Sequence, residues 1–185
     1  MKNLFLLMLL SVLFSSCESE RVKPAVDKSL NVQELPAQES WNSTVFFTDS
    51  GKTKAILETG HLRVFEQSRE TLLDSNIRVD FYNEDEIKTT TLTALRGRVD
   101  DATRDLYAID SVVAVNDSGL TLTTDELMWR NSDRKIVSDK FVTIITPKEK
   151  IQGYGFESDQ GLKNYVIYNI TYVTRNESVK DSVKK

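Results

Sequence analysis

The sequence is poor in the residues on which disulfide frameworks, metal cages and catalytic relays depend. Its 185 residues include one cysteine, one histidine, seven glycines and three prolines. These numbers exclude collagenous, disulfide-stapled and zinc-knuckle designs, because each needs many more of at least one such residue type. A serine–histidine–aspartate relay would have only His61 to use. We therefore expect no cofactor, no metal site and no enzymatic activity.

An excess of positive charge is also missing. The chain has 24 Lys and Arg against 28 Asp and Glu, which gives a formal net charge of -4. Proteins that bind nucleic acids normally carry a basic stripe that neutralises phosphates. We expect no nucleic-acid partner, and the length supports a single domain.

The longest apolar run lies at the N-terminus, over residues 4–14. As a helix it would be about 16 Å long, roughly half of the hydrocarbon core of a membrane. With Lys2 before it, the run predicts a secretory signal peptide over residues 1–16. The run ends in Ser15-Ser16-Cys17, which resembles the lipobox of bacterial lipoproteins. This resemblance implies that Cys17 is acylated and becomes the first mature residue; the alternative is an ordinary cleaved signal that leaves a free thiol.

The composition changes along the rest of the chain. Residues 17–40 contain Pro24 and Pro36 with several charges and no sustained period, so we expect a flexible tether there. Residues 41–174 form the expected domain, and residues 175–185 are expected to be a disordered charged tail.

Within the domain, apolar and polar residues alternate in short segments rich in Val, Ile, Thr and Tyr. A period of two in such segments predicts β-strands. Turn-forming residues separate the segments, for example at 83–85, 100–103, 116–119, 131–133 and 147–150. Residues 66–78 could instead form an amphipathic helix, but Asp74-Ser75-Asn76 favours a turn between two strands. The sequence therefore predicts an all-β fold.

A short motif recurs in the domain: an aspartate, two residues, an apolar residue, any residue, and a second apolar residue. It begins at Asp74, Asp110 and Asp139. The three copies begin 36 and 29 residues apart, and a segment of that length holds two strands and a turn. This spacing is typical of a hairpin that is repeated until the apolar faces of the copies share one core. The alternative is that an antiparallel meander produces such matches by chance.

Four segments in order resemble the LptC family: 120–129, 135–139, 142–144 and 151–158. The last of them has the form I-x-G-x-G-F-E-S and contains Gly153 and Gly155. The resemblance covers about residues 41–172. It implies a twisted, V-shaped and open-ended antiparallel β-jellyroll of the OstA-like type, whose groove holds the acyl chains of lipopolysaccharide. It also implies that the protein receives this lipid from an inner-membrane ABC transporter and passes it to an LptA-like bridge protein.

The resemblance further implies a position at the periplasmic face of the inner membrane. Well-known relatives keep a transmembrane helix, whereas the lipobox-like Cys17 indicates attachment to the membrane by a lipid anchor, with the outer membrane as the alternative location. Alternating residues of a stacked meander face inward. On that basis we expect seven residues to line the groove: Val79, Phe81, Val113, Val115, Val142, Ile144 and Phe156. Filling of an ordinary core is the alternative for each.

Unpaired edge strands are expected to dock partners. The candidates are Thr44, Val45 and Phe46 at one edge, and Tyr165, Ile167, Tyr168 and Ile170 at the other.

Two other functional classes remain open. The carboxylates at 84–86 and 125–126 would suit acid–base catalysis of glycoside cleavage, although adjacent carboxylates in turns are usually only hydrated. A surface or periplasmic lipoprotein that binds glycans or another protein would use Trp41, Trp129 and Tyr154 as stacking residues. Basic pairs near strand ends, such as Arg96 with Arg98 and Arg130 with Arg134, would suit contact with lipid phosphates.

Overall fold

The structure, a computed structural model, describes residues 35–175. The predicted signal peptide, Cys17, most of the predicted tether and nearly all of the predicted tail lie outside the described residues. The described part contains nine strands and no helix, so the all-β prediction is confirmed. The strands are β1 (Gln38–Asp49), β2 (Lys52–Phe65), β3 (Glu70–Tyr82), β4 (Lys88–Asp100), β5 (Asp105–Asn116), β6 (Thr121–Arg130), β7 (Lys135–Ile145), β8 (Glu149–Ser158) and β9 (Tyr165–Arg175).

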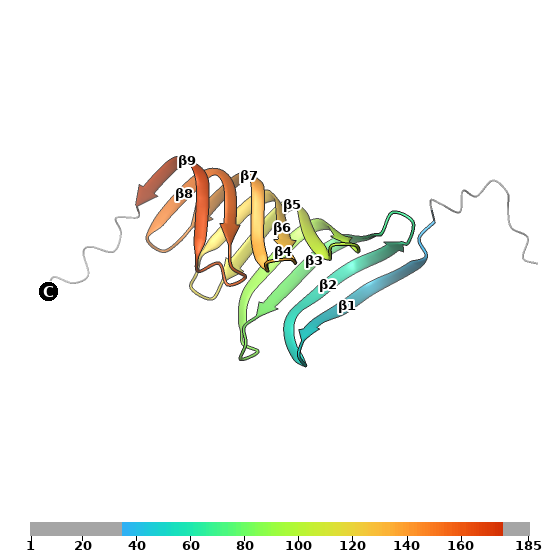
Figure 1. The fold of residues 1–185 in the computed structure, drawn as a ribbon. Helices are drawn as coiled ribbons and strands as arrows, with labels where there is room; N and C mark the ends of the chain where they lie inside the picture. The colour runs from blue at the N-terminus through green and yellow to red at the C-terminus, as the bar shows by residue number, and fades with distance from the viewer. Residues whose placement is uncertain (1–34, 176–185) are drawn as a thin grey trace, which may run out of the picture. The chain divides into compact units, whose positions relative to one another are not determined.

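The strands form one antiparallel sheet in the order of the sequence, from β1 to β9 (Figure 1). Within residues 35–175, β1 and β9 each pair with one neighbour only, so the described sheet is open at both ends, as an OstA-like jellyroll requires. Turns at residues 83–87, 101–104, 117–120, 131–134 and 146–148 overlap the polar segments that predicted them. The helix considered for residues 66–78 is wrong, because residues 66–69 form a turn and β3 follows.

Almost every ladder is interrupted near the middle of its strands, and the strands bend there. The pairing of β3 with β4 shifts between Asp74 and Ile77, and Ser75 and Asn76 have positive φ angles of 63° and 61°. The turn that was expected at 74–76 is therefore a bulge within β3, and bulges of this kind bend a strand. The repeated aspartates lie in β3, β5 and β7, one hairpin apart, and each lies at such an irregularity.

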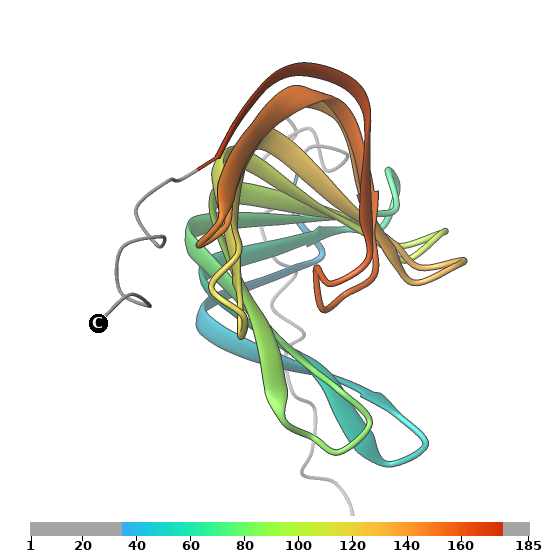
Figure 2. The same ribbon diagram turned by 90° about the vertical axis from the view of Figure 1, so that its left-hand side faces the viewer.

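The bent strands turn the sheet into a trough, which is visible along the stack of strands in Figure 2. Turns after β1, β3, β5 and β7 lie along one margin of the sheet, here called the odd margin. Turns after β2, β4, β6 and β8 lie along the even margin. The two margins face each other across the open side of the trough, since Asp49 at the odd margin pairs with Arg134 at the even margin at 3.1 Å.

The concave face of the sheet carries the core. Directly paired residues form one apolar row across all nine strands. The row consists of Val45, Leu57, Val79, Leu92, Ala114, Leu122, Ile144, Ile151 and Val173. Its members from Leu57 to Ile144 are buried, whereas Val173 on the edge strand is 50% exposed. We call this concave face of the sheet the inner face. The exposed Val173 shows that its apolar surface continues to the last strand.

Candidate functional site

A cleft of about 680 Å³ opens between the two margins, toward the β1 end of the sheet. Its odd-margin wall comes from the ends of β1 and β3 and the start of β2. Its even-margin wall comes from the ends of β4 and β6 and the start of β5. The apolar lining residues are Phe46, Phe47, Ala55, Val79, Phe81, Val99, Leu106 and Trp129. The volume lies within the range of ligand pockets, about 300–1,000 Å³.

Charged side chains also line this cleft, and all of them except Lys54 are exposed to solvent. They are Asp49, Lys54, Glu84, Asp101, Arg104 and Arg134. Lys54 Nζ lies 2.7 Å from Glu84 Oε2, and the hydrogen bond from this ammonium group lowers the pKa of Glu84 below its ordinary value. The site therefore combines an apolar floor with a rim of mixed charge, which matches a ligand that has apolar and polar parts.

The predicted groove residues separate into three groups. Val79 and Phe81 line the cleft. Val142, Ile144 and Phe156 are fully buried and fill the core, with the Phe156 ring stacked on Tyr165 at a centroid distance of 6.1 Å.

Val113 and Val115 lie on the opposite face of the sheet, so their placement on the inner face is wrong. Val115 is 41% exposed, while Val112 and Ala114 are buried. The reason is local: in β5 the positive φ angles begin at Asp110 itself, whereas in β3 they begin at Ser75, one residue after the aspartate. A shift of one residue moves every following side chain to the other face.

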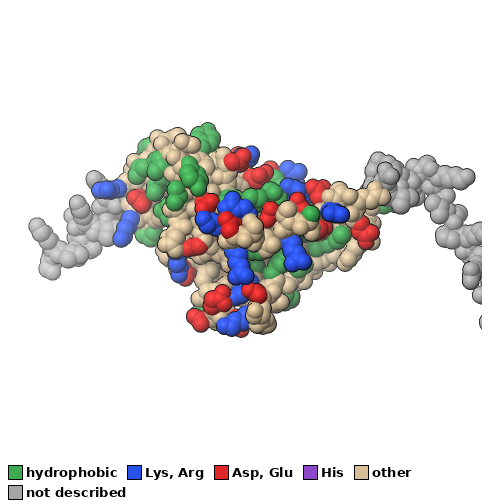
Figure 3. Space-filling view, in the orientation of Figure 1, with side chains coloured by type: hydrophobic (Ala, Val, Ile, Leu, Met, Phe, Trp, Pro, Cys, Tyr) green, Lys and Arg blue, Asp and Glu red, His purple; other side chains and the backbone are tan. Residues whose placement is uncertain are grey.

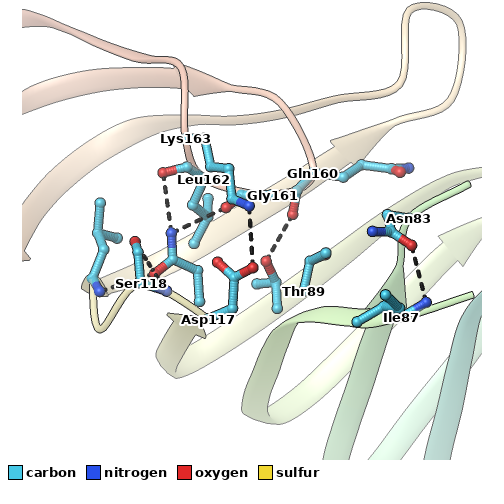
Figure 4. Close-up of polar contacts among 12 residues, drawn as sticks. Asn83, Ile87, Thr89, Asp117, Ser118, Gln160, Gly161, Leu162 and Lys163 are labelled. Carbon is cyan, nitrogen blue, oxygen red and sulfur yellow. Dashed lines mark hydrogen bonds and ion pairs between the residues drawn. The ribbon is translucent and has the colours of Figure 1, made fainter. Parts of the chain in front are cut away.

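The turn between β8 and β9 reaches across the open side of the trough. We call residues 159–164 the strap. Thr90 Oγ1 donates a hydrogen bond to the Gln160 carbonyl at 2.9 Å, and Asn116 Nδ2 donates to the Gly161 carbonyl at 3.1 Å. Gln160 and Gly161 of the strap are labelled in Figure 4. Leu162 is 1% exposed and belongs to the core.

The strap is held with moderate strength. Burial of a leucine contributes about 1.5–3 kcal/mol, and each hydrogen bond contributes about 0.5–1.5 kcal/mol net. Leu162 has a φ of 51°, a left-handed conformation that costs an L-residue about 1–2 kcal/mol. The strap is therefore a turn that is attached to the rest of the sheet by one buried side chain and a few hydrogen bonds from side chains, and not by strand pairing.

Some residues of the site are not apparent from the sequence. Val99, Leu106 and Trp129 reach the cleft only because the even margin folds over the odd margin. The indole N–H of Trp129 is buried and has no hydrogen-bond partner among the described residues. Alternation along one strand identifies a face, but it carries no information on which margins meet.

The candidate partner edges are the outer strands of the sheet. At β1, Thr44 and Phe46 are exposed and Val45 packs against the core. At β9, Tyr165 and Ile167 pack against the core, and burial raises the pKa of the Tyr165 phenol. Tyr168 and Ile170 are exposed. Apolar side chains gather over β8 and β9 in the space-filling view (Figure 3).

The two glycines of the predicted motif hold β8 against β9. A Cβ atom on Gly153 would overlap the Asn169 carbonyl oxygen. Gly155 has a φ of 76°, which an L-residue rarely adopts. Gly153 therefore allows the close approach of β8 to β9, and Gly155 allows the left-handed backbone conformation of β8 at that position.

The remaining candidates show ordinary surface chemistry. His61 stacks on Trp41 with ring centroids 5.3 Å apart, and its Nε2 lies 2.7 Å from Glu39 Oε1. Arg96 pairs with Asp110, and Arg98 pairs with Glu70. Among residues 35–175 no group of three or more metal-ligating side chains occurs. The same residues include no helix of the length and apolarity needed to cross a bilayer.

Residues 4–172 match the sequence family described as LptC, lipopolysaccharide-assembly, LptC-related. A search of curated proteins found no match to the chain. The family match covers every strand up to most of β9.

Proposed function

Because the chain belongs to the LptC-related family of lipopolysaccharide assembly, we propose that it carries lipopolysaccharide from an inner-membrane ABC transporter to an LptA-like bridge protein. Membership of this family implies involvement in lipopolysaccharide transport and a place on the periplasmic side of the inner membrane. The direction of transfer, the two partners and the anchor at Cys17 are parts of the proposal.

The cleft is the observation that carries this proposal. Its floor is formed by apolar residues such as Val79, Phe81 and Leu106, and its rim is charged. An amphiphile fits this arrangement with its acyl chains on the floor and its polar head group at the mouth. The apolar row then continues along the inner face to Val173 on β9.

An open trough also suits a protein that must release its cargo. Burial of one methylene is worth about 0.8 kcal/mol, so a fully buried chain of about twelve carbons approaches 10 kcal/mol. A closed pocket for several such chains would not release them. An open cleft leaves part of each chain exposed, and the energy for directional movement comes from the nucleotide-hydrolysing transporter.

The buried indole N–H of Trp129 supports a cargo with acceptor groups near its chains. An unsatisfied buried donor costs about 1–3 kcal/mol, and Trp129 lines the cleft. Ester and amide carbonyls, which join acyl chains to a sugar head group, are acceptors of the required kind.

The unpaired strands β1 and β9 are the proposed docking sites. Each exposes a row of backbone donors and acceptors that a further strand can continue. We assign β1 to the transporter and β9 to the bridge protein, which would extend the inner face without a break.

The alternatives have less support. Glu84 is paired with Lys54 and its pKa is lowered, whereas a general acid needs a raised pKa. Trp41 is on β1 and Tyr154 on β8, at opposite ends of the sheet, while Trp129 lies inside the cleft. These three aromatic residues therefore do not form one platform for glycans, and we propose that the protein is not an enzyme.

The test uses a photo-reactive residue, p-benzoylphenylalanine, in place of Phe81 in cells. We expect adducts with lipopolysaccharide after irradiation. The matched control carries the same residue in place of Val115, which lies on the opposite face and is more exposed, so it should give none. Equal yields at the two positions, or no adduct at Phe81 in a folded protein, would contradict the proposal.

Docking is tested with the same residue at Tyr168 on β9 and at Thr44 on β1, which is exposed and does not line the cleft. The first should trap a bridge protein, and the second should trap a component of the transporter. A complete absence of protein adducts along β9 would count against its assigned role.

A further inference from the structure

The strap, which is the β8–β9 turn, contacts β4 and the β5–β6 turn, although neither is its neighbour in the sheet. Its anchors are Thr90 at the start of β4 and Asn116 at the end of β5, which are 1% and 6% exposed. Lys163 Nζ adds an ion pair with Asp117 at 3.1 Å (Figure 4). The strap starts from the even margin and all these partners lie at the odd margin, so it forms a bar across the open side of the trough.

This bar lies between the two ends of the inner face. Gln160 of the strap is one of the residues that line the cleft. Of the apolar row, Val79 on β3 lies on the cleft side of the anchors, and Val173 on β9 lies on the other side. Any movement along the inner face from the cleft toward β9 must therefore pass the strap, whose Leu162 side chain is packed in the core.

An amphiphile cannot make that movement while the strap is docked. Its chains would need the apolar surface that Leu162 of the docked strap shares as part of the core. Its head group must project through the open side into water, because burial of a polar head without partners is unfavourable. We propose that the strap is a gate, which undocks from Thr90 and Asn116 to let the head group pass and then closes behind it. This inference rests on the proposed function.

The anchoring of the strap is compatible with repeated opening. It is held at the odd margin by side chains and not by strand pairing. Eleven non-glycine residues in the described chain have a positive φ, and Leu162 is the one apolar member of that set. Strained backbone of this kind is characteristic of segments that switch between two positions. The ion pair of Asp49 with Arg134 also crosses the open side, but both side chains are largely exposed and the pair is weak.

The first experiment locks the strap in the full chain. Asp117→Cys and Lys163→Cys replace two exposed side chains that form an ion pair in the wild type by two thiols. A short bis-methanethiosulfonate reagent then joins the two thiols in spheroplasts. The control is the single variant Lys163→Cys with the same reagent. Each protein carries p-benzoylphenylalanine at Phe81 or at Val173, and adducts with lipopolysaccharide are measured after irradiation.

In the locked protein we expect the Phe81 adduct to persist and the Val173 adduct to fall at least fivefold, with recovery when a reductant cleaves the link. An unchanged Val173 yield in a verified cross-linked protein overturns the gate but leaves the cleft assignment intact. A parallel loss of both adducts also overturns it, since the strap would then control loading. No Phe81 adduct in any state overturns the proposed function, and the gate with it.

The second experiment loosens the strap with Thr90→Val and Asn116→Asp. The Asn116 Oδ1 atom accepts hydrogen bonds from the backbone N–H groups of Ser118 and Leu120. Aspartate keeps that acceptor for the turn, but it loses the donor and places a carboxylate against the strap carbonyls. We expect faster hydrogen exchange of the Leu162 amide and at least a twofold rise in the Val173 adduct. Faster exchange without that rise overturns the gate.

Discussion

Gly153 marks the closest approach of β8 and β9. Substitution of Gly153 by alanine forces the new Cβ atom into the Asn169 carbonyl and the Ile167 side chain. We expect Gly153→Ala to lower the free energy of unfolding by about 1–3 kcal/mol and to weaken pairing of β9, measured by denaturant unfolding and by amide exchange in β9.

Gly51→Ala is a control with open space around the added carbon but a positive φ of 79°. It should cost no more than the left-handed backbone penalty, about 1–2 kcal/mol, and should leave exchange in β9 unchanged. Exchange in β9 that is insensitive to Gly153→Ala would contradict the close approach.

Leu122 and Val115 test which face of the sheet holds the core. Leu122 is fully buried at the centre of the apolar row, and Val115 is exposed on the other face. We expect Leu122→Ala to cost about 2–5 kcal/mol and Val115→Ala to cost about 0.5 kcal/mol or less, both measured by urea unfolding. Similar losses for the two variants would argue against the register of β5 and β6.

Strands β6, β7 and β8 are joined on the outer face by a cluster of charges. Glu157 on β8 accepts hydrogen bonds from Lys135 and from Arg130, and Arg130 also pairs with Asp133. The hydrogen bond from Lys135 is the main cause of a lowered pKa at Glu157, and the hydrogen bond from Arg130 lowers the pKa of Asp133. The cluster fixes the even margin at the turn that also carries Arg134.

This cluster predicts a pH dependence. A carboxyl group whose pKa is lowered by folding stabilises the folded state above its ordinary pKa, 4.5 for glutamate, and that stabilisation is lost as the pH falls through the lowered value. Glu157→Gln should therefore lower the urea midpoint at pH 7, and the difference from the wild type should shrink toward pH 3.

The control for this pH dependence is Glu58→Gln. Glu58 is an exposed carboxylate on β2 without an ion pair among the described residues. Its substitution breaks no ion pair among the described residues and should change the urea midpoint at pH 7 only slightly. A Glu157→Gln effect that does not vary with pH would contradict the role of the charge.

At the scale of elements, the strands and turns follow from alternation and from turn residues such as those at 116–119. The faces follow as well, except where a bulge is one residue out of step, as at Asp110. The strap could not be predicted in this way, because Thr90 and Gln160 are 70 residues apart and nothing in their local pattern pairs them. The same holds for Trp129 and Leu106 in the cleft, which depend on how far the strands bend.

At the scale of the whole sheet, each strand has extensive backbone contacts only with its neighbours in sequence. Stability in such an arrangement is approximately a sum of nearest-neighbour contributions. We expect hydrogen exchange to be slowest in β4, β5 and β6 and fastest in β1 and β9, as measured by mass spectrometry.

The strap adds one coupling beyond nearest neighbours. Loosening it with Thr90→Val and Asn116→Asp should therefore speed exchange in β8 and β9 and leave β1 and β2 unchanged. Equal acceleration in all nine strands would indicate a single cooperative unit and would contradict the additive description.

The strand count has a consequence for any continuous assembly. In a meander of nine strands the first and last run in the same direction. A neighbouring meander added to β9 by simple translation, so that the concave surfaces stay aligned, must therefore meet it with a parallel first strand. An antiparallel junction would require the neighbour to be inverted end over end or to begin with a strand of opposite sense. The odd number of strands in residues 35–175 thus determines whether a junction that keeps the concave surfaces continuous is parallel or antiparallel.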